Sequence, residues 1–456
     1  MAALLSLWSG DGTPIGRSVG LGHTIRLKDP KRSTYVIGTH GTGKSTLLLN
    51  LILADIARQD KGVVVLDPHG DLARAVIARC PPDQAGRVTY FAPLEQRDPV
   101  LGLNPFEMRS EREYELKVEA LMHVFAHTWY GNFSQTPTLQ NTLETLVRTL
   151  LAAYQMHHTS FVHMLLLTRL DETGDRWRRT LSQAVMNNPA LRQNWHEWED
   201  RRRLQTDMES SRQKIKHMIT SDVLYPILCQ PTSAACFRFQ EVLSQNGVLL
   251  VNLEGLEEEG QRLLGSVILT QLLVMARLRE DAADRVPCHI YADEFYKFSP
   301  QSFVTIINEA RKYKLFCTLA HQNLAQLSAT AKAAAGSCGN VIVFRVNPQD
   351  AGILNAHFLS NNRPLSALYL ANLHRFHALV RYADQRYRRQ AEIKTFAERG
   401  QPYPEVAPLI RQQSLRYGRS RAAVEAYVHD ILNPSHAESR PPIRQKAKTP
   451  HKPPRA

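Results

Sequence analysis

A glycine-rich segment that ends in lysine and serine carries the clearest chemistry of the chain. Residues 38–45 read Gly-Thr-His-Gly-Thr-Gly-Lys-Ser and match the phosphate-loop pattern G-x-x-x-x-G-K-[ST] at every fixed position. An apolar run at 35–37 precedes it and a helix-like run at 46–58 follows it, which is the strand–loop–helix context of a nucleoside triphosphate site. We expect Lys44 to reach the β- and γ-phosphates and the Ser45 hydroxyl to ligate Mg²⁺. The predicted nucleotide-binding residues are Gly38, Thr39, His40, Gly41, Thr42, Gly43, Lys44, Ser45, Thr46 and Asp67.

Two adjacent carboxylates follow a second apolar run and are candidates for catalysis. Residues 289–295 read His-Ile-Tyr-Ala-Asp-Glu-Phe, so Asp293 and Glu294 stand at the end of a predicted strand. We predict that Asp293 holds Mg²⁺ through water and that Glu294 polarises the attacking water. The competing run at 248–254 ends in Asn252, which cannot supply the charge that the metal needs.

Asp67 ends another apolar run, at residues 63–66, and begins the sequence Asp-Pro-His-Gly-Asp. Ligands of open α/β sheets lie at the carboxyl ends of the strands, so Asp67 is a candidate for orienting Lys44 or a water bound to Mg²⁺. Asp-Pro-x-Gly is also ordinary turn chemistry. The sequence leaves these two interpretations equal.

Three polar residues farther along are candidates for sensing or completing hydrolysis. Gln322 follows the apolar run at 316–320 and is predicted to sense the γ-phosphate. Arg345 lies near the end of the run at 341–346, where a charge among apolar residues is costly unless it is paired. A phosphate in a neighbouring subunit would make Arg345, or alternatively Arg311, an arginine finger. An intramolecular ion pair is the competing interpretation for each arginine.

Composition indicates a globular chain whose basic excess fits either an anionic partner or an ordinary soluble surface. The 456 residues are 43% hydrophobic and 22% charged, with a net charge of +13. Six of the cations lie in the tail at 435–456, against one glutamate. The six cysteines form no C-x-x-C pair and no zinc-ligand spacing with histidines, which favours a reducing cytosol. No apolar stretch approaches the ~18–20 residues of a membrane span.

Alternation of short β-branched runs with helical patterns predicts the fold class. We expect an α/β protein with a RecA-like P-loop domain, in which a mainly parallel sheet carries helices on both faces, and an all-helical insertion. The predicted boundaries are 1–104 and 240–395 for the two parts of the P-loop domain, 105–239 for the insertion, 396–434 for a C-terminal helical unit and 435–456 for a disordered basic tail.

Aromatic and basic residues interleave within the predicted insertion. Trp177 lies in Arg-Trp-Arg-Arg at 176–179, and Trp198 lies in a Trp-His-Glu-Trp segment shortly before Arg-Arg-Arg at 201–203. One interpretation is a solvated helical face whose tryptophans dock on the core. The other is a surface for nucleic acid or a partner protein.

The motifs, taken in order, resemble the FtsK–HerA superfamily of ring-forming, DNA-pumping ATPases. The similarity is strongest to the soluble ATPase part of TraD/TraG-like coupling proteins of type IV secretion. Single motifs are generic, but their order and spacing over about residues 12–430 are specific. The matching segments are PIG at 14–16, GTHGTGKS at 38–45, VVVLDPHGDL at 63–72, LNPFE at 103–107, GVLLVNLEG at 247–255, IYADEF at 290–295, INEARKYKL at 307–315, LAHQNLAQL at 319–327 and NVIVFRVNPQDA at 340–351.

This resemblance implies a DNA-stimulated ATPase that uses ATP and Mg²⁺ and translocates DNA, either single- or double-stranded. It implies a homohexamer in which an arginine of one subunit completes the neighbour's site. The expected partners are DNA, a membrane-anchored secretion component and a relaxosome-like complex. A HerA-like cytosolic DNA translocase and an ATPase that energises protein secretion or assembly stay open as alternatives. Coupling proteins usually carry an N-terminal anchor, whereas this ATPase segment begins near Met1. We therefore expect a cytoplasmic protein that a partner recruits to the inner face of the membrane.

Overall fold

The computed structural model describes residues 12–433, except 29–31, 130–132, 134–135, 232–238, 281–284, 299, 361–362 and 385–386. The tail predicted to be disordered, 435–456, lies outside the described residues. Within the described residues, no helix has the length and apolar character needed to cross a bilayer.

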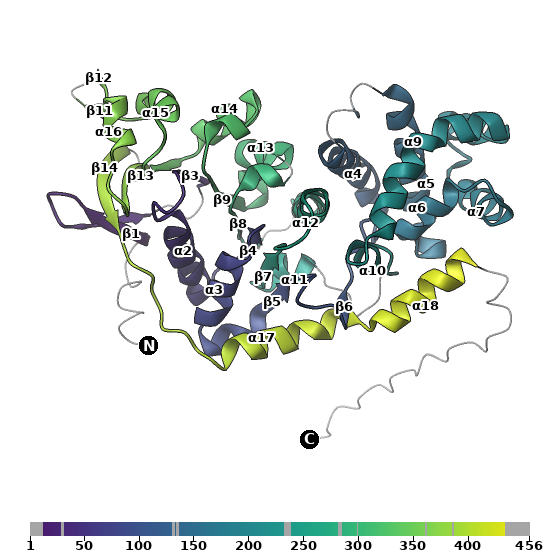
Figure 1. The fold of residues 1–456 in the computed structure, drawn as a ribbon, viewed down its shortest axis with the longest axis horizontal. Coiled ribbons are helices and arrows are strands. Elements are labelled where there is room, and N and C mark those ends of the chain that lie inside the picture. Colours follow the sequence, from purple (N-terminus) through teal and green to yellow (C-terminus); the bar gives the residue numbers. More distant parts are fainter. Residues whose placement is uncertain are drawn as a thin grey trace.

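A large twisted sheet forms the centre of one part of the molecule, the sheet body (Figure 1). Its spatial order is β2 (Thr24–Leu27), β1 (Thr13–Ser18), β14 (Tyr387–Thr395), β13 (His377–Asp384), β10 (Asn340–Val343), β3 (Thr34–Ile37), β9 (Leu315–His321), β8 (Cys288–Ala292), β4 (Gly62–Asp67), β7 (Val248–Asn252) and β5 (Val88–Phe91). The strands from β10 to β5 pair in parallel, and those from β2 to β13 are antiparallel. The predicted fold class, a mainly parallel sheet with helices on both faces, is confirmed.

The parallel strands read as continuous apolar runs because both of their faces are covered. In β4, Val64 and Leu66 point into one core while Val63 and Val65 point into the other. Helices α2 (Lys44–Arg58), α3 (Asp71–Arg79) and α17 (Val406–Ser414) cover one face, and α12 (Glu258–Leu278) and α13 (Pro300–Glu309) lie on the opposite side (Figure 1). Parallel pairing brings the carboxyl ends of β3, β4, β8 and β9 to one edge, where the site must lie.

Helices separate β6 (Val100–Leu101) from β7, and they form a second body beside the sheet (Figure 1). They are α4 (Tyr114–Thr128), α5 (Pro137–His157), α6 (Phe161–Leu167), α7 (Glu172–Ser182), α8 (Pro189–Glu197), α9 (Arg201–Thr220) and α10 (Leu224–Leu228). The last helix before β7, α11 (Phe239–Ser244), packs instead on α12 and β4. Helix α4 packs against α12 and so joins this body to the sheet's own core. We propose that residues 105–239 act as an insertion unit, as the sequence predicted.

The tryptophans of this helical body lie in its core. Trp195 and Trp198 are 5% and 4% exposed, and their rings meet edge to face at 5.1 Å. The indole N–H of Trp198 donates to Asp207 at 3.0 Å, and that of Trp195 donates to Thr149 at 3.0 Å. Trp177 is half-buried and packs edge to face on His163. The geometry therefore favours docked tryptophans over an exposed aromatic surface.

The last described segment runs back along both bodies. Helix α17 packs on β5 and α3, β15 (Gly418–Arg419) pairs with β6, and α18 (Arg421–Leu432) contacts α6 and α10 (Figure 1). The C-terminal helical unit thus contacts both the sheet body and the helical body.

Candidate active site

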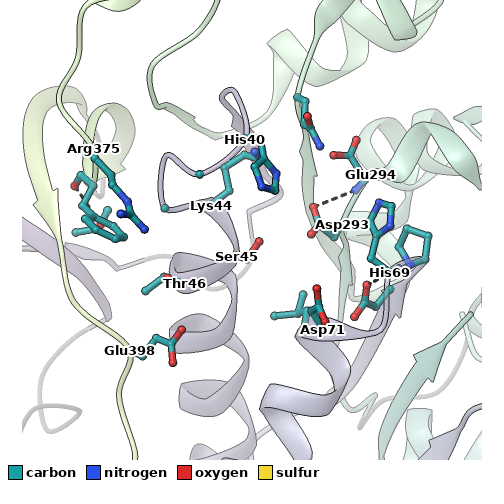
Figure 2. A pocket seen from close by; sticks show the side chains of 18 of the residues that line it. His40, Lys44, Ser45, Thr46, His69, Asp71, Asp293, Glu294, Arg375 and Glu398 are labelled. Atoms are coloured by element: carbon teal, nitrogen blue, oxygen red, sulfur yellow. Dashed lines mark hydrogen bonds between the residues drawn. The ribbon is translucent and has the colours of Figure 1, made fainter. Parts of the chain in front are cut away.

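A cavity of about 980 Å³ opens at the carboxyl edge of the parallel strands (Figure 2). It brings together most of the residues that the sequence singled out. The predicted residues that line it are His40, Gly41, Gly43, Lys44, Ser45, Thr46, Asp67, Asp293, Glu294 and Gln322. Gly38, Thr39 and Thr42 belong to the same loop but do not line the cavity. The Thr42 hydroxyl donates to the Thr39 carbonyl at 2.8 Å.

The phosphate loop takes a conformation that requires glycine. Gly41 and Gly43 have φ angles of 73° and 115°, in the left-handed region that side chains rarely adopt. A Cβ on Gly43 would lie 2.7 Å from the ring of Phe376. The loop is also tied to the neighbouring strand, because the Thr39 N–H donates to the Arg345 carbonyl at 2.8 Å. The loop is therefore preformed by its own backbone.

Lys44 begins α2 and is held over the loop. Its Nζ donates to the carbonyls of Gly38 at 2.7 Å and Thr39 at 3.1 Å, and the residue is 7% exposed. Burial lowers the pKa of Lys44, while the charges of Asp293 and Glu294 oppose that shift. Figure 2 shows Lys44 facing these two carboxylates across the cavity. This arrangement presents one cation to an incoming phosphate.

Asp293 follows β8, and its Oδ1 accepts the Glu294 N–H at 3.1 Å. Burial raises the pKa of Asp293 to about 7, with further contributions from Glu294 and Asp67 and opposition from Lys44. Burial and the neighbouring acids thus disfavour the charged form of this carboxyl group, and a bound cation would favour it.

Glu294 has the geometry expected of a group that acts on water. It is 3% exposed and adopts the left-handed region at φ 47°, an uncommon backbone for a non-glycine residue. Its Oε2 is buried and has no hydrogen-bond partner among the described residues. A buried oxygen without a partner costs free energy in the fold, so its retention beside the cavity favours a functional role.

Asp67 performs the turn role that the sequence left open. It is 1% exposed, its Oδ1 accepts the His69 N–H at 3.0 Å and its Oδ2 accepts the Ala73 N–H at 2.9 Å. These bonds fix the start of α3. Burial raises the pKa of Asp67, and the backbone hydrogen bonds oppose that shift. The carboxyl group also lines the cavity, so a role toward nucleotide stays a prediction.

The three candidate sensors take different positions. Gln322 directly follows β9, the strand between β3 and β8, and lines the cavity. The expectation that Arg345 is a charge enclosed by apolar residues is wrong, because β10 ends at Val343 and Arg345 lies exposed in the loop beyond it. Arg311 lies in the short turn η5 (Ala310–Tyr313), and its side chain is outside the part of the chain that the structure describes.

Sequence reasoning missed the residues that a hairpin brings to the site. The segment before β13 and the end of β14 with the residues after it line the cavity on the side of α2 away from Asp293 and Glu294 (Figure 2). The Phe376 N–H donates to the Thr42 carbonyl at 2.9 Å, and the Arg375 guanidinium lies 4.7 Å from the Phe376 ring centre. The added lining residues are Arg375, Phe376, Lys394, Thr395, Ala397 and Glu398. Since no local motif marks them, only the antiparallel pairing of β13 and β14 reveals them.

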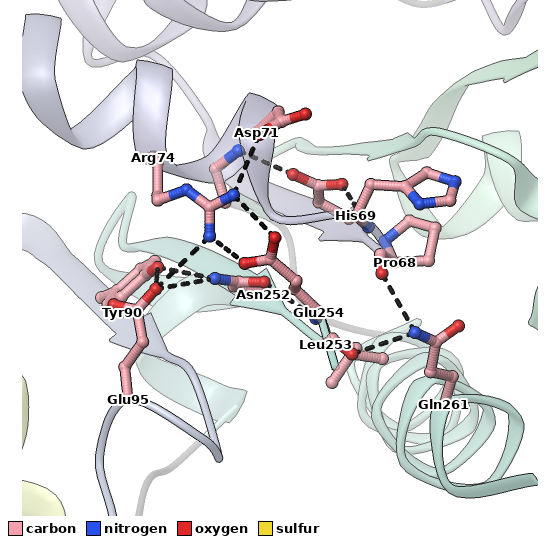
Figure 3. Close-up of polar contacts among 12 residues, drawn as sticks. Pro68, His69, Asp71, Arg74, Tyr90, Glu95, Asn252, Leu253, Glu254 and Gln261 are labelled. Carbon is pink, nitrogen blue, oxygen red and sulfur yellow. Dashed lines mark hydrogen bonds and ion pairs between the residues drawn. The ribbon is translucent and has the colours of Figure 1, made fainter. Parts of the chain in front are cut away.

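A polar network fixes the strand ends beside the cavity (Figure 3). Arg74 of α3 bridges Asp71 and Glu254, both of which line the cavity, and it lies 3.6 Å from Glu95. Glu254 and Asp71 raise the pKa of Arg74. Asn252 donates to Glu95 at 3.0 Å and to the Tyr90 hydroxyl at 2.9 Å, so it is engaged in structure.

The donor set fits Mg²⁺ held jointly with a phosphate. The described residues contain no group of three or more His, Cys, Asp or Glu side chains arranged to hold a metal alone. The Ser45 hydroxyl and the Asp293 carboxylate are oxygen donors that line the same cavity. Mg²⁺ prefers oxygen ligands and commonly keeps several waters beside one or two protein groups and substrate phosphates.

Together, the order of the parallel strands, the preformed phosphate loop and the two carboxylates at the end of β8 define a RecA-like P-loop NTPase fold. Residues 18–272 match the family model described as the central domain of helicase HerA. The chain belongs to this family, and the predicted membership of the FtsK–HerA superfamily is confirmed.

Solved structures of a conjugative coupling protein and of VirB4 share the fold. The bacterial conjugative coupling protein TrwBdeltaN70 is 17% identical with a TM-score of 0.62, covering 88% of this chain and 93% of its own. TrwB in complex with ADP and Mg²⁺ gives 17% and 0.63, covering 88% and 94%. VirB4 of Thermoanaerobacter pseudethanolicus gives 14% and 0.55, covering 85% and 97%. No curated protein matches the sequence significantly.

Proposed function

We propose that this protein is an ATP-hydrolysing motor that moves DNA in conjugation or type IV secretion. The observation that carries the proposal is the buried, unpartnered Oε2 of Glu294, across the cavity from Lys44. A nucleotide-binding scaffold would gain nothing from keeping that oxygen unsatisfied. The shared fold with TrwB, which has been solved with ADP and Mg²⁺, and with VirB4 supports the choice of nucleotide and apparatus.

In this proposal each cavity residue has one task. Lys44 and the N–H groups of residues 38–46 would bind the phosphates, and Ser45 and Asp293 would hold Mg²⁺. The bound ion would neutralise charge that develops on the β- and γ-phosphates. Glu294 Oε2 orients the attacking water and accepts its proton. Gln322, which follows β9 and lines the cavity, would sense the γ-phosphate and report its loss.

The proposal includes a homohexamer with DNA in its channel. The exposed guanidinium of Arg345 stands on the loop whose carbonyl anchors the phosphate loop, so it is available to a neighbouring subunit. Arg311 is the second candidate for the residue that acts in trans. A membrane-anchored secretion component and a relaxosome-like complex are the proposed further partners.

Hydrolysis measured with and without DNA tests the motor. We expect single- or double-stranded DNA to stimulate ATP hydrolysis, Lys44→Ala to abolish nucleotide binding, and Glu294→Gln to bind ATP while losing about 10²–10⁴-fold in kcat. Glu115→Gln, which removes the charge of an exposed carboxylate on α4, is the matched control and should hydrolyse ATP normally. Equal rates with and without DNA would refute the DNA motor. An active Glu294→Gln variant would refute the assignment of the site.

A further inference from the structure

A second cavity, of about 350 Å³, lies within the helical body. None of the residues that line it lines the nucleotide cavity. Helices α7, α8 and α9 enclose it. Four arginine side chains and two carboxylates line it. The charged residues that line it are Arg178, Arg179, Arg192, Arg201, Asp175 and Glu199.

The carboxylates of this cavity are already engaged. Asp175 pairs with Arg178 and, at 2.9 Å, with Arg201. Glu199 lies 3.2 Å from the ring of His196. Arg179 and Arg192 are exposed, and neither has a carboxylate within ion-pairing distance among the residues that the structure describes. Two positive charges at one cavity are therefore left for a ligand.

Buried side chains, those of Arg178, Trp195 and Trp198, also line this cavity. Arg178 is 8% exposed and donates to the Leu167 carbonyl at 3.0 Å. The indole N–H groups of Trp195 and Trp198 are bonded to Thr149 and Asp207, so the rings cannot turn outward without losing those bonds. A ligand would meet a wall whose shape is set before binding, which reduces the entropy lost on association.

The geometry points to an acidic peptide of a partner protein as the ligand, and we propose that its carboxylates pair with Arg179 and Arg192. Guanidinium groups bind carboxylates in bidentate geometry. Single-stranded nucleic acid would instead need exposed aromatic faces on which bases stack, and both tryptophans of this cavity are buried. The chain's own tail at 435–456 is basic and is repelled by the same charges. The proposal does not depend on ATP hydrolysis.

Fluorescence anisotropy with the full chain tests the proposal. The probes are a fluorescein-labelled oligoglutamate peptide and a labelled oligodeoxythymidine. We expect the double variant Arg179→Ala/Arg192→Ala to bind the peptide about tenfold more weakly than the wild type, equivalent to ~1.4 kcal/mol. The matched control, Arg176→Ala/Arg202→Ala, removes two exposed arginines of α7 and α9 that do not line the cavity and should bind normally.

Each other outcome decides against the acidic-peptide site. Equal losses in the two double variants would mean that the peptide senses net charge only. Displacement of the peptide by oligodeoxythymidine, with loss of both probes in the cavity variant alone, would make this a nucleic-acid site. Absence of peptide binding to the wild type would also refute the proposal. The Arg179→Lys/Arg192→Lys variant, which keeps both charges, should recover part of the affinity and would separate charge from any change of fold.

Discussion

Replacing Asp293 by asparagine is expected to stabilise the metal-free protein above pH 7 while it abolishes hydrolysis. Burial and the nearby acids Glu294 and Asp67 raise the pKa of Asp293 to about 7, from its ordinary value of 3.8. Between these two pH values the folded state keeps a proton that the unfolded state has lost. Stability therefore falls as the pH rises through this window, and a neutral side chain at position 293 avoids the loss.

The size of this effect follows from the shift in pKa. A difference of about 3 pKa units corresponds to about 4 kcal/mol at full ionisation, at 1.36 kcal/mol per unit. Water that enters the open cavity screens the charge and reduces the expected gain to about 2 kcal/mol. The unfolding entropy of a chain this long gives about 1 °C per kcal/mol, so the expected rise in Tm is about 2 °C. Asparagine retains an Oδ1 that can accept the Glu294 N–H bond.

Thermal unfolding without nucleotide or Mg²⁺ measures the effect. The gain in Tm of Asp293→Asn should be largest at about pH 8, smaller near pH 5 and absent well below pH 3.8, where the wild-type carboxyl group is protonated in both the folded and the unfolded state. Asp71→Asn is the control, because Asp71 lines the same cavity but is 90% exposed and pairs with Arg74. This control should show no gain. A variant at Asp293 that is less stable at about pH 8, or whose gain is the same at both pH values, would refute the reasoning.

Two further predictions concern buried charge elsewhere in the fold. Asp55→Ala should lower the free energy of unfolding by about 3–5 kcal/mol in chemical denaturation, because it removes the buried partner of Lys61. Lys61 Nζ lies 2.9 Å from the Asp55 carboxylate, and Lys61 is 4% exposed. Asp60→Ala is the control: Asp60 is the half-exposed second acid near Lys61, and its loss should cost less than about 1 kcal/mol. Burial lowers the pKa of His163 from 6.5 to about 4. Between these two pH values the unfolded state binds a proton that the folded state does not. The free energy of unfolding should therefore fall by up to about 3 kcal/mol as the pH drops through this range. His163→Asn, whose Oδ1 can accept the Ser160 N–H that Nδ1 accepts now, should flatten this dependence in unfolding curves recorded across the window, and an unchanged slope would contradict it.

The sequence predicted the nucleotide side of the site well because its signals are local. The phosphate loop needs glycine at positions of positive φ and a lysine at the start of a helix, and both features are fixed by neighbouring residues. Asp293 and Glu294 follow an apolar strand directly. Once the strands are parallel, their carboxyl ends meet at one edge, so local patterns sufficed to place the side chains together.

Other parts of the site depend on contacts that no local pattern records. Arg375 and Phe376 reach the phosphate loop because β13 pairs antiparallel with β10 and β14 pairs with β13, which folds a distant hairpin over Gly43. Arg345 was misplaced because the predicted strand ran to residue 346, whereas β10 ends three residues earlier, at Val343. Trp198 could be assigned to a surface or a core only after the packing of α5 against α9 was known. In each case tertiary pairing, rather than residue type, decides the outcome.

The two bodies that hold the cavities share one hydrophobic core. The acids at the nucleotide cavity's rim are held by Arg74, which approaches Glu95, and Glu95 is paired at 3.3 Å with Arg411 of α17. From α17 the chain passes through β15 into α18, where Arg421 pairs at 3.2 Å with Asp222 of the helical body. The helical body is therefore positioned by α18 as well as by the contact of α4 with α12. Exposed ion pairs of this kind are individually weak. The packing of α17 on β5 and of α18 on α10 must therefore contribute most of the free energy that holds the two bodies together through this segment.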